Sequence, residues 1–115
     1  NTERFQLVLT AYLRPARIVR DRKITGEITP DLFETAEERA LWQVYQEVRR
    51  QIWPSVRMGE FVEAFEPLIE PINRFFDKVF VMVKDEAVRQ NRLLLLQAIA
   101  DLQTGIADLT EIRDV

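Results

Sequence analysis

The sequence contains no cysteine and no histidine, and these two absences exclude several kinds of chemistry. The chain cannot form a disulfide, a thiolate nucleophile, a Cys/His zinc site or a Ser-His-Asp triad. Its three glycines are isolated, so it has neither a phosphate-binding loop nor a dinucleotide fingerprint. We therefore predict no catalytic residue and no autonomous enzyme. The lack of cysteine is compatible with a reducing compartment, and we expect a cytoplasmic protein.

Long apolar runs are also missing. None approaches the roughly 18 residues that span a bilayer, and the first residues, "NTERFQLVLT", carry no basic segment or signal-peptide cleavage pattern. We therefore predict no membrane partner. A chain of 115 residues suggests one domain, residues 1–115, large enough for a hydrophobic core. Because the sequence does not begin with Met, we expect it to be a fragment of a longer chain.

Net positive charge is concentrated in one segment. The net charge is −3, yet residues 14–23, "RPARIVRDRK", carry a local charge of +4, which leaves −7 for the rest of the chain. The cations of this segment are Arg14, Arg17, Arg20, Arg22 and Lys23. They are either a solvated helix end, where cations favour the helix dipole, or a surface that binds phosphates.

The apolar residues recur mostly at helical spacing. The pattern predicts a first helix that kinks or restarts at Pro15, a connector over residues 24–35, and a second helix over about 36–53. Thr35 followed by Glu38 is typical of a capping box at the start of that second helix. Further helices are expected after Pro54. The fold class is therefore predicted as all-α, a single bundle of four or five helices.

Residues 72–83 fit either a strand or a helix by propensity. We predict a helix, because no other segment offers a convincing partner strand. Asp85 is expected to cap the last helix, which runs from about Glu86 into the low hundreds or beyond. The run "LLLL" at 93–96 makes one turn of it apolar all round, as in a helix that other helices surround. The main apolar stripe of this helix is Val88, Leu95, Ile99, Leu102, Ile106 and Leu109.

Three further groups of side chains are candidates for function. Trp42 and Trp53 lie on one flank of the second helix with Arg49 between them, which suits either the rim of a core or a stacking surface for bases. Arg89 and Arg92 either reach a ligand or pair with nearby acids. A carboxylate row on one helix face is expected to be solvated rather than a metal site, because carboxylate metal bundles usually add histidine. That row is Glu60, Glu63, Glu66 and Glu70.

The stretch "FFDKVFVMVKDEAVRQNRLLLL", residues 75–96, resembles the C-terminal anticodon-binding domain of the bacterial glycyl-tRNA synthetase β subunit. That family has a pattern like FFDxVMVM, then acidic residues, then A/L-x-R-x-NRLxLL. The matching residues here are Phe75, Phe76, Asp77, Val79, Val81, Met82, Ala87, Arg89, Asn91, Arg92, Leu93, Leu95 and Leu96. "LFETAEERALW" and "IADLTEI" are similar to two other family segments, so the resemblance covers nearly the whole chain.

Four positions depart from the family pattern, and one keeps it. Leu94 stands where the family has a smaller or variable residue. Phe80 stands where the family usually has Met, which we interpret as a swap within the core. In "RPARI", Arg14 keeps the family's arginine, whereas Pro15 and Arg17 stand in place of Val and Asn. The resemblance also implies kinship with the all-α DALR anticodon-binding domain of arginyl-tRNA synthetase.

The function follows from this resemblance. It implies a parent enzyme that uses ATP and Mg to activate glycine and charge glycine tRNA, with catalysis in an α subunit or a fused α portion. This domain would bind the anticodon arm and need no cofactor of its own. Cations would hold phosphates while polar and aromatic groups contact unstacked bases. The alternative is a helical module for protein interaction or subunit assembly, without RNA contact.

Overall fold

Helices form all the regular structure in the computed structural model, which describes residues 2–22, 24–52 and 58–105. The elements are α1 (Thr2–Val19), η1 (Pro30–Leu32), α2 (Ala36–Ile52), α3 (Met58–Phe65), η2 (Glu66–Leu68), α4 (Ile69–Lys78), α5 (Glu86–Ala100) and η3 (Asp101–Gly105). The described ranges contain no strand, so the predicted all-α bundle is confirmed. None of their helices is long and apolar enough to cross a membrane.

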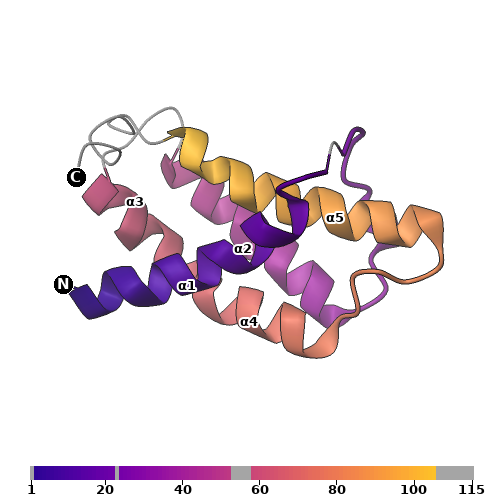
Figure 1. Cartoon of the computed structure of the whole chain (residues 1–115), viewed down its shortest axis with the longest axis horizontal. Coiled ribbons are helices and arrows are strands. Elements are labelled where there is room, and N and C mark those ends of the chain that lie inside the picture. Colours follow the sequence, from indigo (N-terminus) through magenta and orange to yellow (C-terminus); the bar gives the residue numbers. More distant parts are fainter. Residues whose placement is uncertain (1, 23, 53–57, 106–115) are drawn as a thin grey trace.

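The first and last described α-helices are each other's main partners. α1 packs most extensively against α5. Both helices lie on the face of the bundle that Figure 1 shows. Tyr12 joins them, because its hydroxyl donates a hydrogen bond to the Ala100 carbonyl at 3.1 Å. Val8 and Ala11 are buried between them. The core of the domain therefore unites residues from opposite ends of the sequence.

Pro15 does not restart α1, contrary to one of the two predicted outcomes. The helix is continuous from Thr2 to Val19, and the proline ring is fully buried. A proline inside a helix removes one backbone hydrogen bond. Here the ring fills the same buried face as Ala11 and Val19, so it packs into the core.

A reciprocal cap begins α2, as the sequence predicts. The Thr35 hydroxyl accepts from the Glu38 N–H at 3.1 Å, and Glu38 Oε1 accepts from the Thr35 N–H at 3.0 Å. The Glu34 N–H donates to the same oxygen at 3.0 Å. Donors at the helix start that have no partner within the helix are satisfied in this way.

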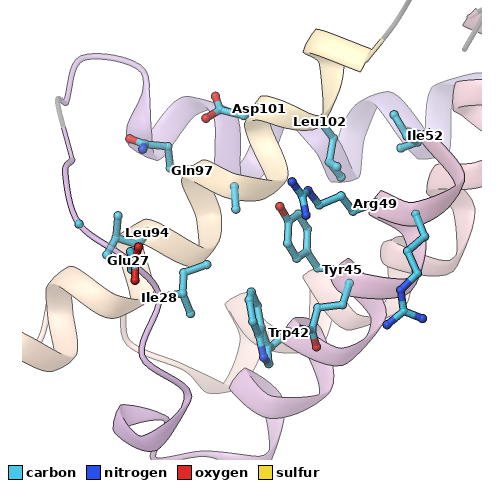
Figure 2. A pocket seen from close by; sticks show the side chains of 14 residues that line it. Glu27, Ile28, Trp42, Tyr45, Arg49, Ile52, Leu94, Gln97, Asp101 and Leu102 are labelled. Atoms are coloured by element: carbon cyan, nitrogen blue, oxygen red, sulfur yellow. The ribbon is translucent and has the colours of Figure 1, made fainter. Parts of the chain in front are cut away.

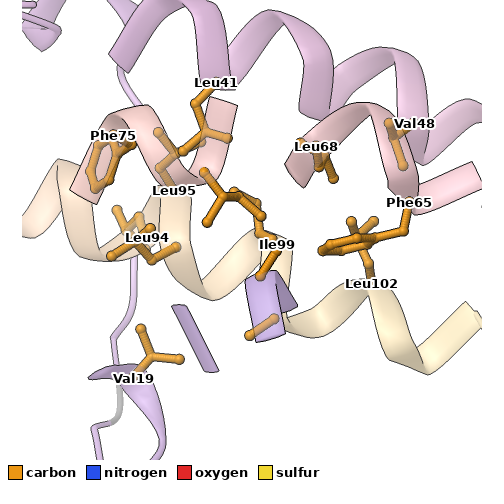
Figure 3. Packing of buried hydrophobic residues seen from close by; sticks show 14 of the residues in the cluster. Val19, Leu41, Val48, Phe65, Leu68, Phe75, Leu94, Leu95, Ile99 and Leu102 are labelled. Atoms are coloured by element: carbon orange, nitrogen blue, oxygen red, sulfur yellow. The ribbon is translucent and has the colours of Figure 1, made fainter. Parts of the chain in front are cut away.

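The four leucines of α5 lie in the middle of the bundle. All of 93–96 are buried, and Leu95, Leu96 and Ile99 are fully so. Figure 3 shows Leu95 and Ile99 among side chains of neighbouring helices, such as Leu41 and Leu68. The predicted all-apolar turn is therefore confirmed. Leu102 continues the stripe as a buried residue of η3, while Ile106 and Leu109 lie outside the described residues.

The helix predicted through Val83 is wrong at its end. α4 ends at Lys78, and Val79 is extended, with φ −114° and ψ 127°. Burial then alternates along the chain: Val79 and Val81 are buried, whereas Phe80 and Met82 are 70% and 39% exposed. Phe80 is therefore not a core residue, and its substitution for Met is not a core swap.

Two arginine side chains bind backbone carbonyls of residues 79–83, which form no helix. Arg92 Nη1 donates to the Phe80 carbonyl at 2.7 Å, and Arg89 Nη1 donates to the Val83 carbonyl at 3.2 Å. These side chains satisfy backbone acceptors that a helix would otherwise satisfy. Asp85 then begins α5 as predicted, because its Oδ1 accepts from the Val88 N–H at 3.2 Å.

Candidate nucleic-acid interface

The cationic segment occupies the last turns of α1 and the residues after it. Arg14, Arg17 and Arg20 are spaced by three residues and are exposed, so they lie along one side of the chain. Arg14 is the most constrained of them. Its Nη1 donates to Asn73 Oδ1 at 3.1 Å, and its guanidinium carbon lies 4.8 Å from the centre of the Phe76 ring. Both partners belong to α4, so Arg14 is held in place before any ligand arrives.

The end of this segment is also ordered by its own backbone. Arg22 Nε donates to the Ile18 carbonyl at 2.9 Å, which satisfies one acceptor at the end of α1. Lys23 lies outside the described residues. The structure thus gathers Arg14, Arg17, Arg20 and Arg22 at one end of α1.

A groove of about 910 Å³ opens between α2, α5 and the connector that follows the cationic segment. Figure 2 shows Trp42, Tyr45 and Arg49 along α2 on one side of it. Gly26, Glu27 and Ile28 line it from the connector. Leu94, Gln97, Ala98, Asp101 and Leu102 line it from α5 and η3.

An aromatic pair forms the α2 side of the groove. The rings of Trp42 and Tyr45 are stacked, 5.7 Å apart with planes 20° from parallel. Phe33 supports Trp42 from behind at 6.2 Å. Both groove aromatics are half-buried, so part of their surface is accessible from the groove. The sequence predicted that Trp42, Arg49 and Trp53 share one flank of the second helix. Trp42 and Arg49 both line this groove, and Trp53 lies outside the described residues.

Tyr45 is a groove residue that sequence reasoning missed. Its helical spacing from Leu41 and Val48 is typical of a core residue, and the available signal was its spacing of three from Trp42. Burial raises the pKa of the Tyr45 phenol, and Asp101 raises it further, against the opposing effect of Arg49. The hydroxyl is therefore neutral at physiological pH, and it remains a possible hydrogen-bond donor.

Three amides of α5 hold the connector against the bundle. Gln97 Nε2 donates to the Ile24 carbonyl at 3.0 Å, and Gln90 Nε2 donates to the Thr25 carbonyl at 3.2 Å. Asn91 makes two bonds with Thr29: its Oδ1 accepts from the N–H at 2.7 Å, and its Nδ2 donates to the carbonyl at 3.0 Å. These pairs fix one wall of the groove.

Arg92 is built into the core, unlike the other predicted cations. Its side chain is 4% exposed and its partner Glu38 is fully buried. Nε lies 3.1 Å from Glu38 Oε2, and Nη2 lies 3.1 Å from Glu38 Oε1 and 3.2 Å from Glu34 Oε1. Burial by itself raises the pKa of the Glu38 carboxyl, but hydrogen bonds from Arg92, Glu34 and Thr35 outweigh it and hold that pKa below its usual value. The guanidinium serves the fold here, and Arg89 is directed to the Val83 carbonyl.

Two members of the carboxylate row, which extends from α3 into η2 and α4, form ion pairs. Glu66 pairs with Arg4 at 2.5 Å, and Glu70 pairs with Arg74 at 2.6 Å. Within the residues that the structure describes, no group of His, Cys, Asp and Glu is arranged to hold a metal ion.

Comparison with known proteins places this helical fold in a family. The family model described as "DALR anticodon binding domain" matches residues 8–112. Because this match covers most of the chain, the protein belongs to the DALR anticodon-binding domain family.

Individual relatives show which proteins this chain resembles. The chain is 43% identical over 110 residues to the chloroplastic/mitochondrial glycine–tRNA ligase 2 of Arabidopsis thaliana, covering 94% of this chain and 10% of that protein. It is 40% identical over 110 residues to the glycine–tRNA ligase beta subunit of Desulforudis audaxviator, covering 93% and 16%. For the beta subunit of Halothermothrix orenii the identity is 30% over 115 residues, covering 97% and 17%. The chain thus spans a small part of the length of the relatives it matches.

Proposed function

We propose that this domain binds the anticodon arm of glycine tRNA as part of a glycine–tRNA ligase. The observation that carries the proposal is the family match over residues 8–112 together with relatives that are glycine–tRNA ligases. The domain supports ATP-dependent charging, while another part of the enzyme carries out the chemistry. That part is an α subunit or a fused α portion, and it would hold ATP and Mg. We place the parent enzyme in the cytoplasm, where translation occurs.

The cationic segment is the proposed contact for phosphates. This segment carries a net positive charge on an otherwise acidic chain, through Arg14, Arg17, Arg20, Arg22 and Lys23. RNA phosphates are repelled by acidic surfaces, so they approach best where cations gather. Arg14 is already fixed by Asn73 and Phe76, and therefore loses little conformational freedom on binding.

Salt-dependent binding tests this assignment. If about three to five cations contact phosphates, the affinity for the glycine anticodon stem–loop should fall with salt at a log–log slope of roughly −2 to −4. Replacing Arg14, Arg17 and Arg20 together by Ala should weaken binding and flatten the slope. In the parent enzyme, tRNA charging should fall while glycine activation stays nearly unchanged.

A charge-matched variant controls for net charge. Arg74 and Lys78 lie in the second half of α4, and Lys84 lies between α4 and α5. Their replacement by Ala removes the same charge from a different segment. This control should bind nearly as the wild type does. If both triple variants bind with the wild-type affinity and slope while remaining folded, phosphates do not bind at the cationic segment.

The exposed Phe80 favours a second candidate function, contact with another part of the parent enzyme. The chain spans 16% of the Desulforudis audaxviator relative, so a longer parent offers much surface for such a contact. In this case the stem–loop would show no specific, salt-dependent binding. Phe80→Ser would instead weaken association of the domain with the rest of the enzyme.

A further inference from the structure

The first half of α1 presents apolar side chains to the outside of the bundle. Phe5, Leu7 and Leu9 are 37%, 54% and 37% exposed, whereas Val8 between them is 3% exposed. Successive helical residues are about 100° apart, so Leu7 and Leu9 point to opposite sides of Val8, and Phe5 shares the side of Leu9. The core covers the Val8 side of these turns. Exposed apolar groups therefore lie on both flanks of the helix start, at one end of the bundle in Figure 1.

Charge is absent from the same part of the helix. Residues 5–13, "FQLVLTAYL", contain no charged residue in a chain that is 30% charged. The exposed side of α2, by contrast, carries Arg39, Glu47, Arg49 and Arg50. A helix side that faces water is normally polar, and the cores of protein interfaces are depleted of charge. Scattered exposed leucines need no explanation, but a cluster of large apolar side chains without any charge is typical of a covered surface.

This chemistry separates the two halves of α1. After residue 13 the cations begin with Arg14, and the attraction that phosphates feel there is missing along residues 5–13. An apolar surface is stabilised by other apolar groups that exclude water from it. The partner of the first half is therefore a protein surface with apolar side chains of its own.

The size of the apolar patch distinguishes a separate protein from a tethered one. Three partly exposed side chains can bury only roughly a few hundred Å², whereas a stable contact between separate proteins buries about 800 Å² on each partner. A second copy of this chain would therefore bind weakly through the patch. A segment of the same polypeptide has an effective concentration of the order of millimolar, so a small contact suffices. The chain spans 10% to 17% of the relatives described above, and most of such a polypeptide lies outside this domain.

We propose that residues 5–13 form the docking surface through which this domain packs against another part of its own enzyme polypeptide. The inference rests on the proposed function, because it takes the domain to be one part of a glycine–tRNA ligase. Phe5, Leu7 and Leu9 are the anchors of the contact. Because α1 is one continuous helix, the contact also holds the cationic segment at its other end in a defined place relative to the rest of the enzyme.

Thiol labelling measures whether this surface is covered. The 115-residue chain has no cysteine, so Leu7→Cys introduces a single thiol at the most exposed of the three positions. A maleimide should modify it at least about tenfold more slowly in the complete enzyme than in the 115-residue chain, because a buried thiol is inert. Gln43→Cys is the matched control, since Gln43 is exposed on α2, and it should react at similar rates in both proteins. Mass spectrometry of the labelled peptide identifies the modified site.

A charge placed in the contact tests its apolar character. Adding Leu9→Asp to Leu7→Cys in the complete enzyme should bring the labelling rate to within about threefold of that in the 115-residue chain, since a buried unpaired carboxylate is costly. Adding Phe80→Asp instead puts the same charge on a ring that is 70% exposed in another segment, and should leave the thiol protected. Circular dichroism of the 115-residue chain checks that Leu9→Asp folds. Leu7→Cys alone decides the test if it does not.

The inference is overturned if Leu7→Cys is labelled at equal rates in the two proteins. It is also overturned if labelling of the 115-residue chain slows as its concentration rises, which would assign the surface to a second copy, or slows on addition of the glycine anticodon stem–loop, which would assign it to RNA. Protection that a folded Leu9→Asp variant keeps, or that Phe80→Asp removes equally, has the same consequence. Salt-dependent binding of the stem–loop is measured separately, and its absence would overturn the proposed function without changing the labelling result.

Discussion

Replacing Arg92 by Met should severely destabilise the domain, because it leaves Glu38 as a buried carboxylate without its cation. Arg92 is 4% exposed and Glu38 is fully buried. Removing one partner of a buried ion pair costs about 3–5 kcal/mol, a large share of the roughly 5–15 kcal/mol that stabilises a domain. The variant also loses the hydrogen bond that holds the Phe80 carbonyl.

Two control variants separate this explanation from a simple loss of packing. Glu34→Ala removes the exposed partner of Arg92, whose side chain is 62% exposed, and should cost less than about 1 kcal/mol. Adding Glu38→Gln to Arg92→Met should recover part of the loss, because a neutral glutamine can keep the capping box with Thr35. Urea unfolding followed by circular dichroism measures all three variants.

The pH dependence gives a second signature of this pair. In the wild type the pKa of Glu38 is lowered, so its contribution is present above the unfolded pKa of about 4.3 and is lost as the pH falls through the lower folded value. In Arg92→Met, burial should dominate and raise that pKa. The variant should then gain stability as the pH falls from neutral toward the unfolded pKa of about 4.3, which is opposite to the wild-type behaviour. A loss below about 1 kcal/mol with a flat pH profile would refute the reasoning.

Three other substitutions test particular parts of the fold. Leu95→Ala should cost about 2–5 kcal/mol in denaturant titration, because Leu95 is 0% exposed, and a loss under about 1 kcal/mol would show that α5 is not central. Phe80→Ser should change the unfolding temperature little, since that ring is 70% exposed. Asn91→Ala should destabilise by about 1–3 kcal/mol, because it leaves the Thr29 backbone groups without partners, and faster amide exchange at Thr29 would locate the effect.

The sequence predicts the helices where local chemistry decides them. Thr35 with Glu38, Asp85, and the leucines at 93–96 each carry a short-range signal of a cap or a buried turn, and each prediction is confirmed. The error at 79–83 has a long-range cause. Arg92 satisfies the Phe80 carbonyl from another element, and helical periodicity contains no information about such a partner.

The candidate site was predicted only in part for the same reason. The cationic segment is contiguous in the sequence, so counting charges finds it. The groove combines Trp42 and Arg49 with Gln97 and the connector, which come from three separate regions of the chain. Gln97 holds the connector through the Ile24 carbonyl, which lies 73 residues away in the sequence, and such a contact cannot be inferred from spacing along one helix.

The pairing of α1 with α5 has a consequence for how the domain is made. A ribosome releases α1 first, but its main partner is complete only when residue 100 has been synthesised. Until then the core around Val8 and Ala11 is incomplete, and Glu38 lacks Arg92, its partner in the buried ion pair. Partly synthesised chains therefore expose apolar surface and depend on chaperones. A message that terminates before α5 should yield a product that is degraded rather than a smaller working domain.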